Sequence, residues 1–465
     1  MKSRILPLII SVALFMENID STVIATSLPA IALDLNTNPV SLKLAITAYL
    51  ISLAIFIPAS GWAADRYGAR RVFRTAIGVF IIGSVMCAFA GSLLDFVIAR
   101  SIQGMGGAMM TPVGRLLILR SVEKNELVNA LAWLSIPALV GPLLGPPIGG
   151  FITTFFSWEW IFLINVPIGI LGIFLAGRYV PDIKAESVAA IDRVGFVLSG
   201  LACFGLVFGF SVVSLASVPL VIKLGLLLVG VVATALYIPH ARQSTNPLLD
   251  FKLLKVRSFE VSILGGWIFR ISAGAAPFLL PLMLQIGLGM NPFQSGLLTM
   301  AGAAGALIMK IAAGPVLKKF GFRNVLVFNC LIATGFLAIN GLFTTSTPVV
   351  LILAILLIGG FFRSLQFTSL MALSFADIDQ GNMSRATTLS AVSQRISLSM
   401  GVALAAIVLE ISAASHSGPM NTNDFMIAFF TVSAIASLSV FMMLRLPENA
   451  GEEVSGQTRS GPVQR

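Results

Sequence analysis

The sequence is poor in charge. Asp, Glu, Lys and Arg make up only 11% of its 465 residues, whereas 57% are hydrophobic. A soluble domain carries about a quarter charged residues. The scarcity of charge therefore argues against a soluble enzyme or binding domain and predicts an integral membrane protein.

Cysteine and histidine are also scarce. Cys87, Cys203 and Cys330 each lie in an apolar run, without the spacing of a disulfide framework or a metal site, and His240 and His416 are too far apart to form a ligand pair. The sequence lacks the phosphate-binding pattern G-x-x-x-x-G-K-[ST], which excludes ATP as the energy source. It contains no recognisable pair of nucleophile and base. We therefore expect no metal, no cofactor and no enzymatic activity.

The charges that are present are unbalanced, with 30 Lys and Arg against 20 Asp and Glu. An excess of basic residues is typical of nucleic-acid binding, but a basic patch needs a solvated face. The preference of cytoplasmic loops for Lys and Arg explains the excess better. We expect no nucleic-acid partner.

Long apolar runs dominate the chain. A membrane-spanning helix needs about 20 mostly apolar residues. Such runs predict fourteen spans joined by short polar breaks, at about 5–33, 42–64, 73–94, 96–118, 128–154, 159–180, 193–215, 218–240, 259–288, 293–317, 323–344, 348–374, 385–412 and 424–446.

The first run has an alternative interpretation. Its start, MKSRILPLIISVALF, is similar to a secretory signal peptide. The apolar stretch, however, continues past Asp20 to about Leu33, and no soluble domain follows it. We interpret it as the first membrane span.

Lys and Arg predict the topology. With the N-terminus inside, most of them fall in cytoplasmic loops, among them Lys124, and the outer loops keep little beyond Lys43 and Lys223. The asymmetry predicts that both termini are cytoplasmic. The polar tail 447–465 is expected to be a disordered cytoplasmic tail.

The chain also repeats itself weakly. The sequence RSIQ at 100–103 recurs as RSLQ at 363–366, and the turn at 61–71 is similar to that at 314–323. Two similar halves are typical of transporters that rock around a central site. We expect an N-terminal six-helix bundle at 1–184, two intervening membrane helices and a linker at 185–258, and a C-terminal six-helix bundle at 259–446.

Four motifs carry a family resemblance, and a further segment follows them. The motifs are DSTVIATSLP (20–29), GWAADRYGARR (61–71), RSIQGMGGA (100–108) and GPLLGPPIGG (141–150), and the segment is WEWIFLINVPIG (158–169). In this order and on these helices, they resemble the major facilitator superfamily in its fourteen-helix drug:proton antiporter branch. The sequence departs from the branch at Ala25, where Asn is usual, at Glu159, where Arg is usual, and at Lys318, where Asp would complete the second turn.

The resemblance implies an all-α integral membrane fold with two pseudo-symmetric six-helix bundles and two intervening helices. It implies a proton-coupled antiporter of the multidrug efflux type in the bacterial plasma (inner) membrane. Its partners would be a small amphipathic substrate, protons and the lipid bilayer, and we expect a monomer. The alternative is a symporter or uniporter for an organic anion or metabolite.

The turn at 61–71 predicts a conformational latch between the two halves. Gly61 and Gly68 allow close helix approach and a tight turn. Asp65 can accept hydrogen bonds from nearby arginines, and the basic residues Arg66, Arg70 and Arg71 hold the turn at the cytoplasmic face. The alternative is a plain topology signal, which would not need the carboxylate.

The fifth span carries a strip of small residues. Gly141, Gly145, Gly149 and Gly150 let helices pack backbone to backbone, and prolines such as Pro146 permit a kink. The strip is expected to seal or flex the interface between the halves, with tight packing alone as the alternative.

The first span contains two carboxylates, Glu17 and Asp20, and the fourth span contains Arg100. An arginine facing lipid is costly, so we expect Arg100 to pair with Asp20, with Gln103 and Asn18 completing a polar network. Burial favours the neutral form of a carboxyl group, and an adjacent guanidinium favours the ionised form. Asp20 is therefore the candidate proton-coupling residue, with Glu17 as an accessory; a permanent structural ion pair is the alternative.

The second half carries mostly positive charge within its spans. Arg270 and Arg363 are expected to be buried, and Glu410 is the clear acid. This pattern suggests either anion handling or ion pairs between the halves. The candidate residues of the substrate cavity are Asn18, Gln103, Arg270, Arg363 and Gln366.

Overall fold

The computed structural model describes residues 2–121, 127–184, 190–213, 215, 218–244, 247–379, 382–416 and 420–452. Lys124 and the tail beyond Glu452 lie outside these residues. The regular elements within them are helical: α1 (Lys2–Asp34), η1 (Pro39–Leu42), α2 (Lys43–Tyr67), α3 (Ala69–Ala88), α4 (Leu93–Ser121), α5 (Leu127–Phe155), α6 (Trp160–Leu163), α7 (Asn165–Tyr179), α8 (Arg193–Cys203), η2 (Phe204–Phe208), α9 (Gly209–Val212), α10 (Leu220–Gln243), η3 (Phe251–Lys255), α11 (Arg257–Glu260), η4 (Val261–Gly265), α12 (Gly266–Leu282), η5 (Met283–Gly287), α13 (Pro292–Phe320), α14 (Phe322–Asn340), α15 (Val349–Ala376), α16 (Met383–Ala414), α17 (Thr422–Ser437) and α18 (Ser439–Met443).

Twelve helices in the described part of the chain are long and apolar enough to cross a membrane. Short elements join into single spans, as in Arg193–Val212 and Arg257–Gly287. The predicted spans 96–118 and 128–154 correspond to α4 and α5, which have 29 residues each but are not among the twelve. The chain is therefore a multi-pass membrane protein, and the count of fourteen stays a prediction.

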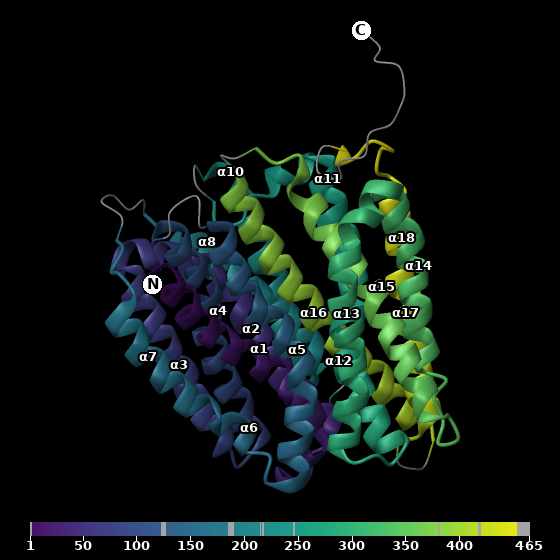
Figure 1. Cartoon of the computed structure of the whole chain (residues 1–465). Helices are drawn as coiled ribbons and strands as arrows, with labels where there is room; N and C mark the ends of the chain where they lie inside the picture. The colour runs from purple at the N-terminus through teal and green to yellow at the C-terminus, as the bar shows by residue number, and fades with distance from the viewer. Residues whose placement is uncertain are drawn as a thin grey trace.

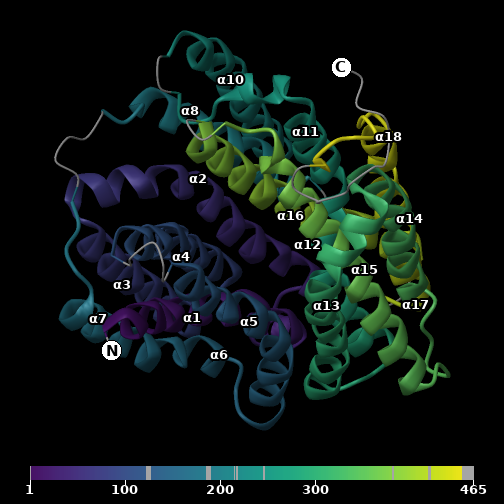
Figure 2. The ribbon, with the colours of Figure 1, turned by 45° about the horizontal axis from the view of Figure 1, so that its top comes forward.

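The helices form two halves that lie side by side (Figure 1), and the main helix contacts within one half correspond to those within the other. In the first half α1 packs against α5, α2 against α4, and α3 against α7; in the second half α12 packs against α16, α13 against α15, and α14 against α17. Between the halves, α5 packs against α13 and α2 against α16. The helices α8 and α10 pack on each other and lie beside α2 and α16 (Figure 2).

Equivalent glycine turns connect α2 to α3 and α13 to α14. Gly68 and Gly321 have φ values of 94° and 74°. Residues with a Cβ atom rarely adopt such positive φ values. A Cβ on Gly68 would lie 2.6 Å from Oδ1 of Asp182. Gly61, in contrast, has open space where its Cβ would be, so the predicted close helix approach at Gly61 is wrong.

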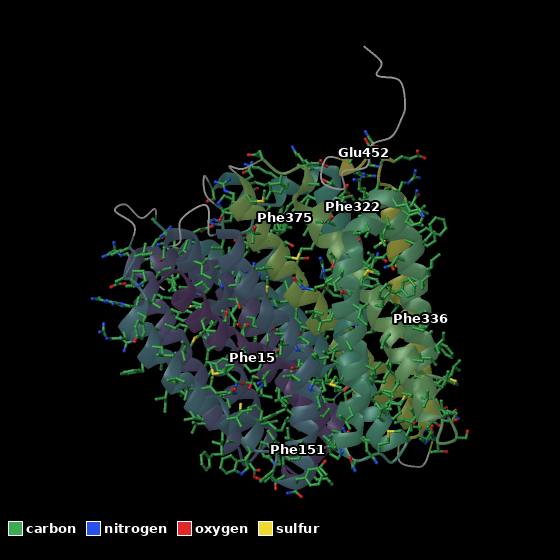
Figure 3. All side chains as sticks on the ribbon, viewed as in Figure 1. Phe15, Phe151, Phe322, Phe336, Phe375 and Glu452 are labelled. Carbon is green, nitrogen blue, oxygen red and sulfur yellow. The ribbon has the colours of Figure 1, made fainter. Side chains whose placement is uncertain are left out.

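Both glycine turns lie at one end of the bundle. We call it the basic end, because Arg66 lies in the last turn of α2 and Lys318 and Lys319 lie in the last turn of α13. Leu6, near the start of α1, packs in the same apolar cluster as Ala69 and Val180, beside the first turn. Leu446, near the end of the described chain, packs in the cluster that contains Phe322, beside the second turn. Figure 3 shows Phe322 and Glu452 at this end and Phe151 at the opposite end.

We predict that Gly68→Ala destabilises the protein and that Gly61→Ala does not. The first change adds a Cβ at a positive φ, which costs of the order of 1–3 kcal/mol, and crowds Asp182. The second adds a methyl group in open space and improves helix propensity. Thermal unfolding in detergent should show a lower midpoint for Gly68→Ala alone. Equal midpoints for both variants would contradict the role given to this turn.

Candidate functional site

A buried ion pair joins α1 to α4. Nη1 of Arg100 lies 2.7 Å from Oδ2 of Asp20, and the two side chains are 1% and 0% exposed. The predicted pairing of Arg100 with Asp20 is therefore confirmed. An unpaired charge would be costly at this depth, and each residue removes that cost from the other.

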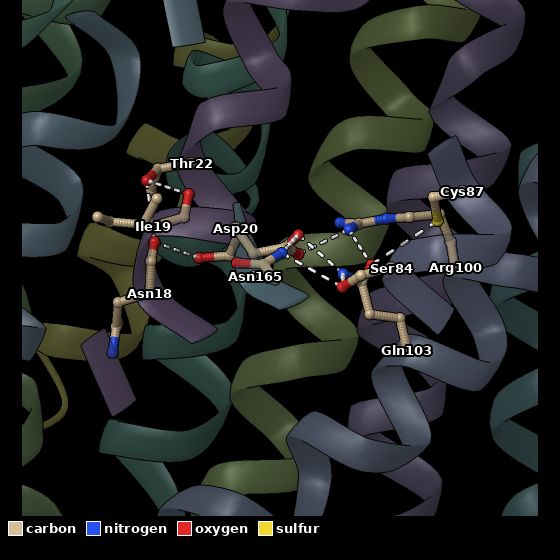
Figure 4. A network of polar contacts seen from close by, with 10 residues as sticks. Asn18, Ile19, Asp20, Thr22, Ser84, Cys87, Arg100, Gln103 and Asn165 are labelled. Atoms are coloured by element: carbon tan, nitrogen blue, oxygen red, sulfur yellow. Dashed lines mark hydrogen bonds and ion pairs between the residues drawn. The ribbon is translucent and has the colours of Figure 1, made fainter. Parts of the chain in front are cut away.

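Two amides complete the shell around Asp20 (Figure 4). Nε2 of Gln103 donates to Oδ1 of Asp20 at 2.8 Å, and Nδ2 of Asn165 donates to the same oxygen at 3.0 Å. Both amides also contact Oγ of Ser84, at 2.8 and 3.2 Å. The carboxylate thus draws α1, α3, α4 and the start of α7 together.

Sequence reasoning chose the wrong asparagine for this network. Nδ2 of Asn18 donates to the backbone oxygen of Leu14, 2.7 Å away, and its side chain does not reach Asp20. Asn165 takes that place. The signal was present, because Asn165 lies inside the segment 158–169 that supports the family resemblance.

Arg100 is enclosed by aromatic rings as well as by polar groups. Its guanidinium carbon lies 4.4 Å from the ring centre of Tyr49 and 5.8 Å from that of Phe162. Its Nη1 also donates to Gln103, whereas its Nε has no hydrogen-bond partner. The cation is thus held by one carboxylate, one amide and two ring faces, so loss of the Asp20 charge would leave it undercompensated.

Glu17 lies one helical turn from Asp20 but has different surroundings. Oγ1 of Thr111 donates to its Oε2 at 2.8 Å, and Nη2 of Arg395, from α16 in the second half, lies 4.0 Å from its Oε1. Asp20 is therefore paired within the first half, whereas Glu17 faces the interface between the halves.

The glycine strip of α5 lets two neighbouring helices approach closely. A Cβ on Gly141, Gly145 or Gly149 would clash with α1, at Asn18, Thr22 and Val23. A Cβ on Gly150 would clash with the backbone of Pro292 in the second half, and one on Gly296 would clash with that of Pro146. The strip thus brings α5 into backbone contact with α1 on one side and with α13 on the other.

A cavity of about 260 Å³ lies between the halves. The first half contributes Thr22, Ala25, Pro142 and Pro146 to its wall, and α12, α13, α14 and α15 contribute the remainder. Lys310 and Arg363 are the charged residues among the lining side chains. The cavity is consequently cationic and otherwise largely apolar.

Other predicted cavity residues lie elsewhere. Arg270 is buried behind the wall, with its guanidinium carbon 6.0 Å from the ring centre of Phe367 and with Nε and Nη1 lacking partners. Gln366 is fully buried and bonds to α14: its Nε2 donates to the Leu326 oxygen, and its Oε1 accepts from Asn329. Neither residue lines the cavity, and neither does Asn18 or Gln103, so the predicted placement of these four residues in the cavity wall is wrong.

The halves also meet at the end opposite the basic end. Nζ of Lys43, the first residue of α2, lies 2.8 Å from Oε2 of Glu410 in α16, and the lysine side chain is fully buried. Nε2 of Gln285 donates to the backbone oxygen of Thr26 at 2.9 Å. Lys43, which was expected in an outer loop, is instead the first residue of a helix and forms a buried pair between the halves.

The turn cluster has its partners within the first half. Nη1 of Arg120 donates to Oδ1 of Asp65 at 2.7 Å, and Arg70 and Arg71 lie 3.7 and 3.8 Å from Asp182. Asp65 thereby ties the end of α2 to the end of α4. These contacts do not join the two halves. The predicted latch between the halves is therefore wrong for the conformation of this structure.

A family model and curated proteins of similar sequence each match most of this chain. The family model of the Major Facilitator Superfamily matches residues 10–402. MdtD, a candidate multidrug resistance protein of Escherichia coli, is 35% identical over 98% of this chain and 97% of its own length, as in strains SE11 and K12 / DH10B.

Two solved structures have the same fold. The D-xylose–proton symporter superposes with a TM-score of 0.67 at 16% identity, covering 96% of this chain and 98% of its own. A bacterial homologue of the human lysosomal transporter Spinster, in an inward-facing and unoccupied conformation, superposes with a TM-score of 0.63 at 16% identity, covering 98% and 97%. At these identities the likeness concerns the fold alone.

Proposed function

Because the chain belongs to the major facilitator superfamily, we propose that it is a proton-coupled secondary transporter that exports small amphipathic compounds by alternating access. The observation that carries the proposal is the cavity between two similarly built halves, within a chain similar to MdtD over nearly its full length. One proton crossing 100 mV releases about 2.3 kcal/mol, enough for roughly a fiftyfold gradient of substrate.

The proposed architecture has fourteen spans. With 29 residues each, α4 and α5 would be about 43 Å long, which suffices to cross a bilayer. The bundles would be 1–184 and 259–446, with 185–258 between them. The basic end would face the cytoplasm of a bacterium, with both termini inside the plasma membrane, because Lys and Arg favour that side. The transporter would act as a monomer.

The cavity suggests the charge of the substrate. Arg363 is half-buried, and no carboxylate is among the described residues that line the cavity. A desolvated cation without a counter-charge is costly, and an anionic ligand would remove that cost. Ala25 adds a further apolar wall where the family usually has an asparagine. Amphipathic compounds with a negative charge would therefore fit best.

The same observation favours a second candidate function, a symporter or uniporter for an organic anion or metabolite. The two functions differ in the direction of transport. An exporter driven by proton entry accumulates substrate in inside-out vesicles with an acidic lumen, whereas a symporter under that gradient expels it.

The coupling residues would be Asp20 and Arg100, with Glu17 as an accessory. Protonation of Asp20 would weaken its pair with Arg100 and thereby loosen the joint between α1 and α4. Glu17 would sense the position of the second half through Arg395. The backbone contact of α5 with α1 and α13 would transmit the movement.

The turn cluster of Gly61, Gly68, Asp65 and the arginines Arg66, Arg70 and Arg71 would act within the first half. The pairs of Asp65 with Arg120 and of Arg70 and Arg71 with Asp182 support a brace that keeps this half rigid as it rocks.

We predict that Arg363→Gln selectively impairs the transport of anionic amphipaths. Loss of a charge-assisted hydrogen bond, worth about 1.5–3 kcal/mol, should weaken their transport roughly tenfold to a hundredfold and spare a cationic dye. The assay is uptake into inside-out vesicles with an acidic lumen. Arg178→Gln is the control, because Arg178 is exposed at the end of α7 and away from the cavity. An equal loss of transport for the anionic amphipaths and for the cationic dye would contradict anion recognition. Expulsion of substrate from the vesicles would favour the symporter.

We also predict that Lys43 and Glu410 hold the outer side of the cavity closed. Replacing both, Lys43→Gln with Glu410→Gln, removes the pair without leaving an orphan charge. A cysteine introduced at Thr299, in the cavity wall, should then react several times faster with an impermeant maleimide added outside the cell. The native cysteines are buried and give a low background.

Two control positions accompany this experiment. A cysteine at Asn421 should react from outside with or without the pair, and one at Lys318 should not react, because they lie at opposite ends of the bundle. An unchanged rate at Thr299 would contradict the gate, and the reverse pattern at the controls would contradict the proposed topology.

A further inference from the structure

A second, larger cavity, which we call the groove, lies outside the interface between the halves. It has a volume of about 700 Å³ and separates the intervening helices α8, η2 and α10 from the second half, where Trp267, Ile396 and Met400 form its wall. The lining residues of α10 run from Leu227 to Arg242, a length of about 22 Å at 1.5 Å per residue. This exceeds the roughly 15 Å of hydrocarbon in one leaflet.

The polar groups along this groove are mostly satisfied by the chain itself. Oγ1 of Thr234 donates to the Gly230 oxygen, Oγ of Ser199 donates to the Phe196 oxygen, and the Tyr237 hydroxyl exchanges hydrogen bonds with the backbone of Leu249. The groove therefore offers few free partners for a polar solute and a long apolar wall for a hydrocarbon chain.

The end of the groove at the basic end is charged. Arg242, in the last turn of α10, and Lys252, in η3, both line it and are exposed. Asp250 also lines it, but its Oδ2 lies 3.2 Å from Nη1 of Arg385, and its Oδ1 accepts from the backbone N–H of Lys252. The carboxylate is thus compensated, and the mouth presents a net positive charge.

The helix that forms one wall of the groove faces the bilayer on its other sides. The other faces of α10 expose apolar side chains such as Val221, Leu224, Leu228 and Val232. Lipid therefore surrounds the helix that forms one wall. Basic pockets between membrane helices on the cytoplasmic side attract anionic headgroups.

We infer that the groove binds an anionic phospholipid, with an acyl chain along α10 and its phosphate between Arg242 and Lys252. The lipid would fill the space between the intervening helices and α16, and would thereby join the helix pair to the second half. The intervening pair would then be a lipid-dependent element of this transporter, distinct from the cavity between the halves.

The test uses phosphatidylglycerol and phosphatidylcholine that carry the same photoactivatable acyl chain. Each is mixed with the purified full-length protein in detergent, and labelled peptides are located by mass spectrometry. Phosphatidylglycerol should label the groove around Leu206 and Met400 at least tenfold more than phosphatidylcholine. In Arg242→Gln with Lys252→Gln, this labelling should fall roughly tenfold to thirtyfold, as expected for two basic side chains beside an anionic headgroup.

Two further variants make the result specific. Lys318→Gln with Lys319→Gln removes two charges at the same end of the bundle but outside the groove, and should keep the labelling. Ala202→Phe fills the groove while leaving both charges, and should reduce the labelling. Folding of each variant is checked by its thermal midpoint and size-exclusion profile.

Three outcomes would overturn the inference. Equal labelling by both lipids would mean a crevice without headgroup recognition. An equal loss in the Lys318 and Lys319 variant would mean attraction by overall charge. Suppression of the labelling by inorganic phosphate at low concentration would mean a phosphate site rather than a lipid site.

Discussion

The fold depends on the need to compensate charge inside an apolar bundle. Asp20 and Arg100 are both fully enclosed, and each offsets the cost of burying the charge of the other. Their pair, together with Gln103 and Asn165, determines how α1, α3, α4 and α7 meet in the first half. The glycines of α5 then allow that helix to lie on α1 at backbone distance. One polar cluster and one strip without side chains thus arrange the helices that line the first-half side of the cavity.

Charges are also compensated between the halves, but there each ion pair depends on how the two halves are placed. Lys43 meets Glu410 at one end of the interface, and Glu17 lies 4.0 Å from Arg395 nearer its middle. Pairs within one half can persist while the halves move, but pairs across the interface must break and form again. In the cavity, no carboxylate is among the described residues that line it, and we propose that a ligand compensates the charge of Arg363. Charge distribution therefore distinguishes pairs within one half, such as Asp20 with Arg100, from pairs between the halves that have to change as the halves move.

Sequence reasoning succeeded where a single physical rule has one solution. An arginine and an aspartate in neighbouring apolar helices have to pair, so Asp20, Arg100 and Gln103 could be predicted. It failed where several partners were available. The choice between Asn18 and Asn165 depends on which helix face turns toward the carboxylate. Gln366 repeats the position of Gln103, but without a carboxylate nearby it bonds to α14 instead. The pair of Lys43 with Glu410 could not be predicted, because the two residues are 367 positions apart in the sequence.

We propose that Asp20 alternates between pairing with Arg100 and carrying a proton. The direct test is accumulation of an exported compound by purified Asp20→Asn in vesicles with an imposed pH gradient, beside Glu17→Gln. We expect Asp20→Asn to lose pH-driven accumulation while it retains substrate binding or downhill exchange, and Glu17→Gln to lose less. Undiminished pH-driven accumulation by Asp20→Asn would show that the carboxylate only anchors Arg100 and that coupling resides elsewhere.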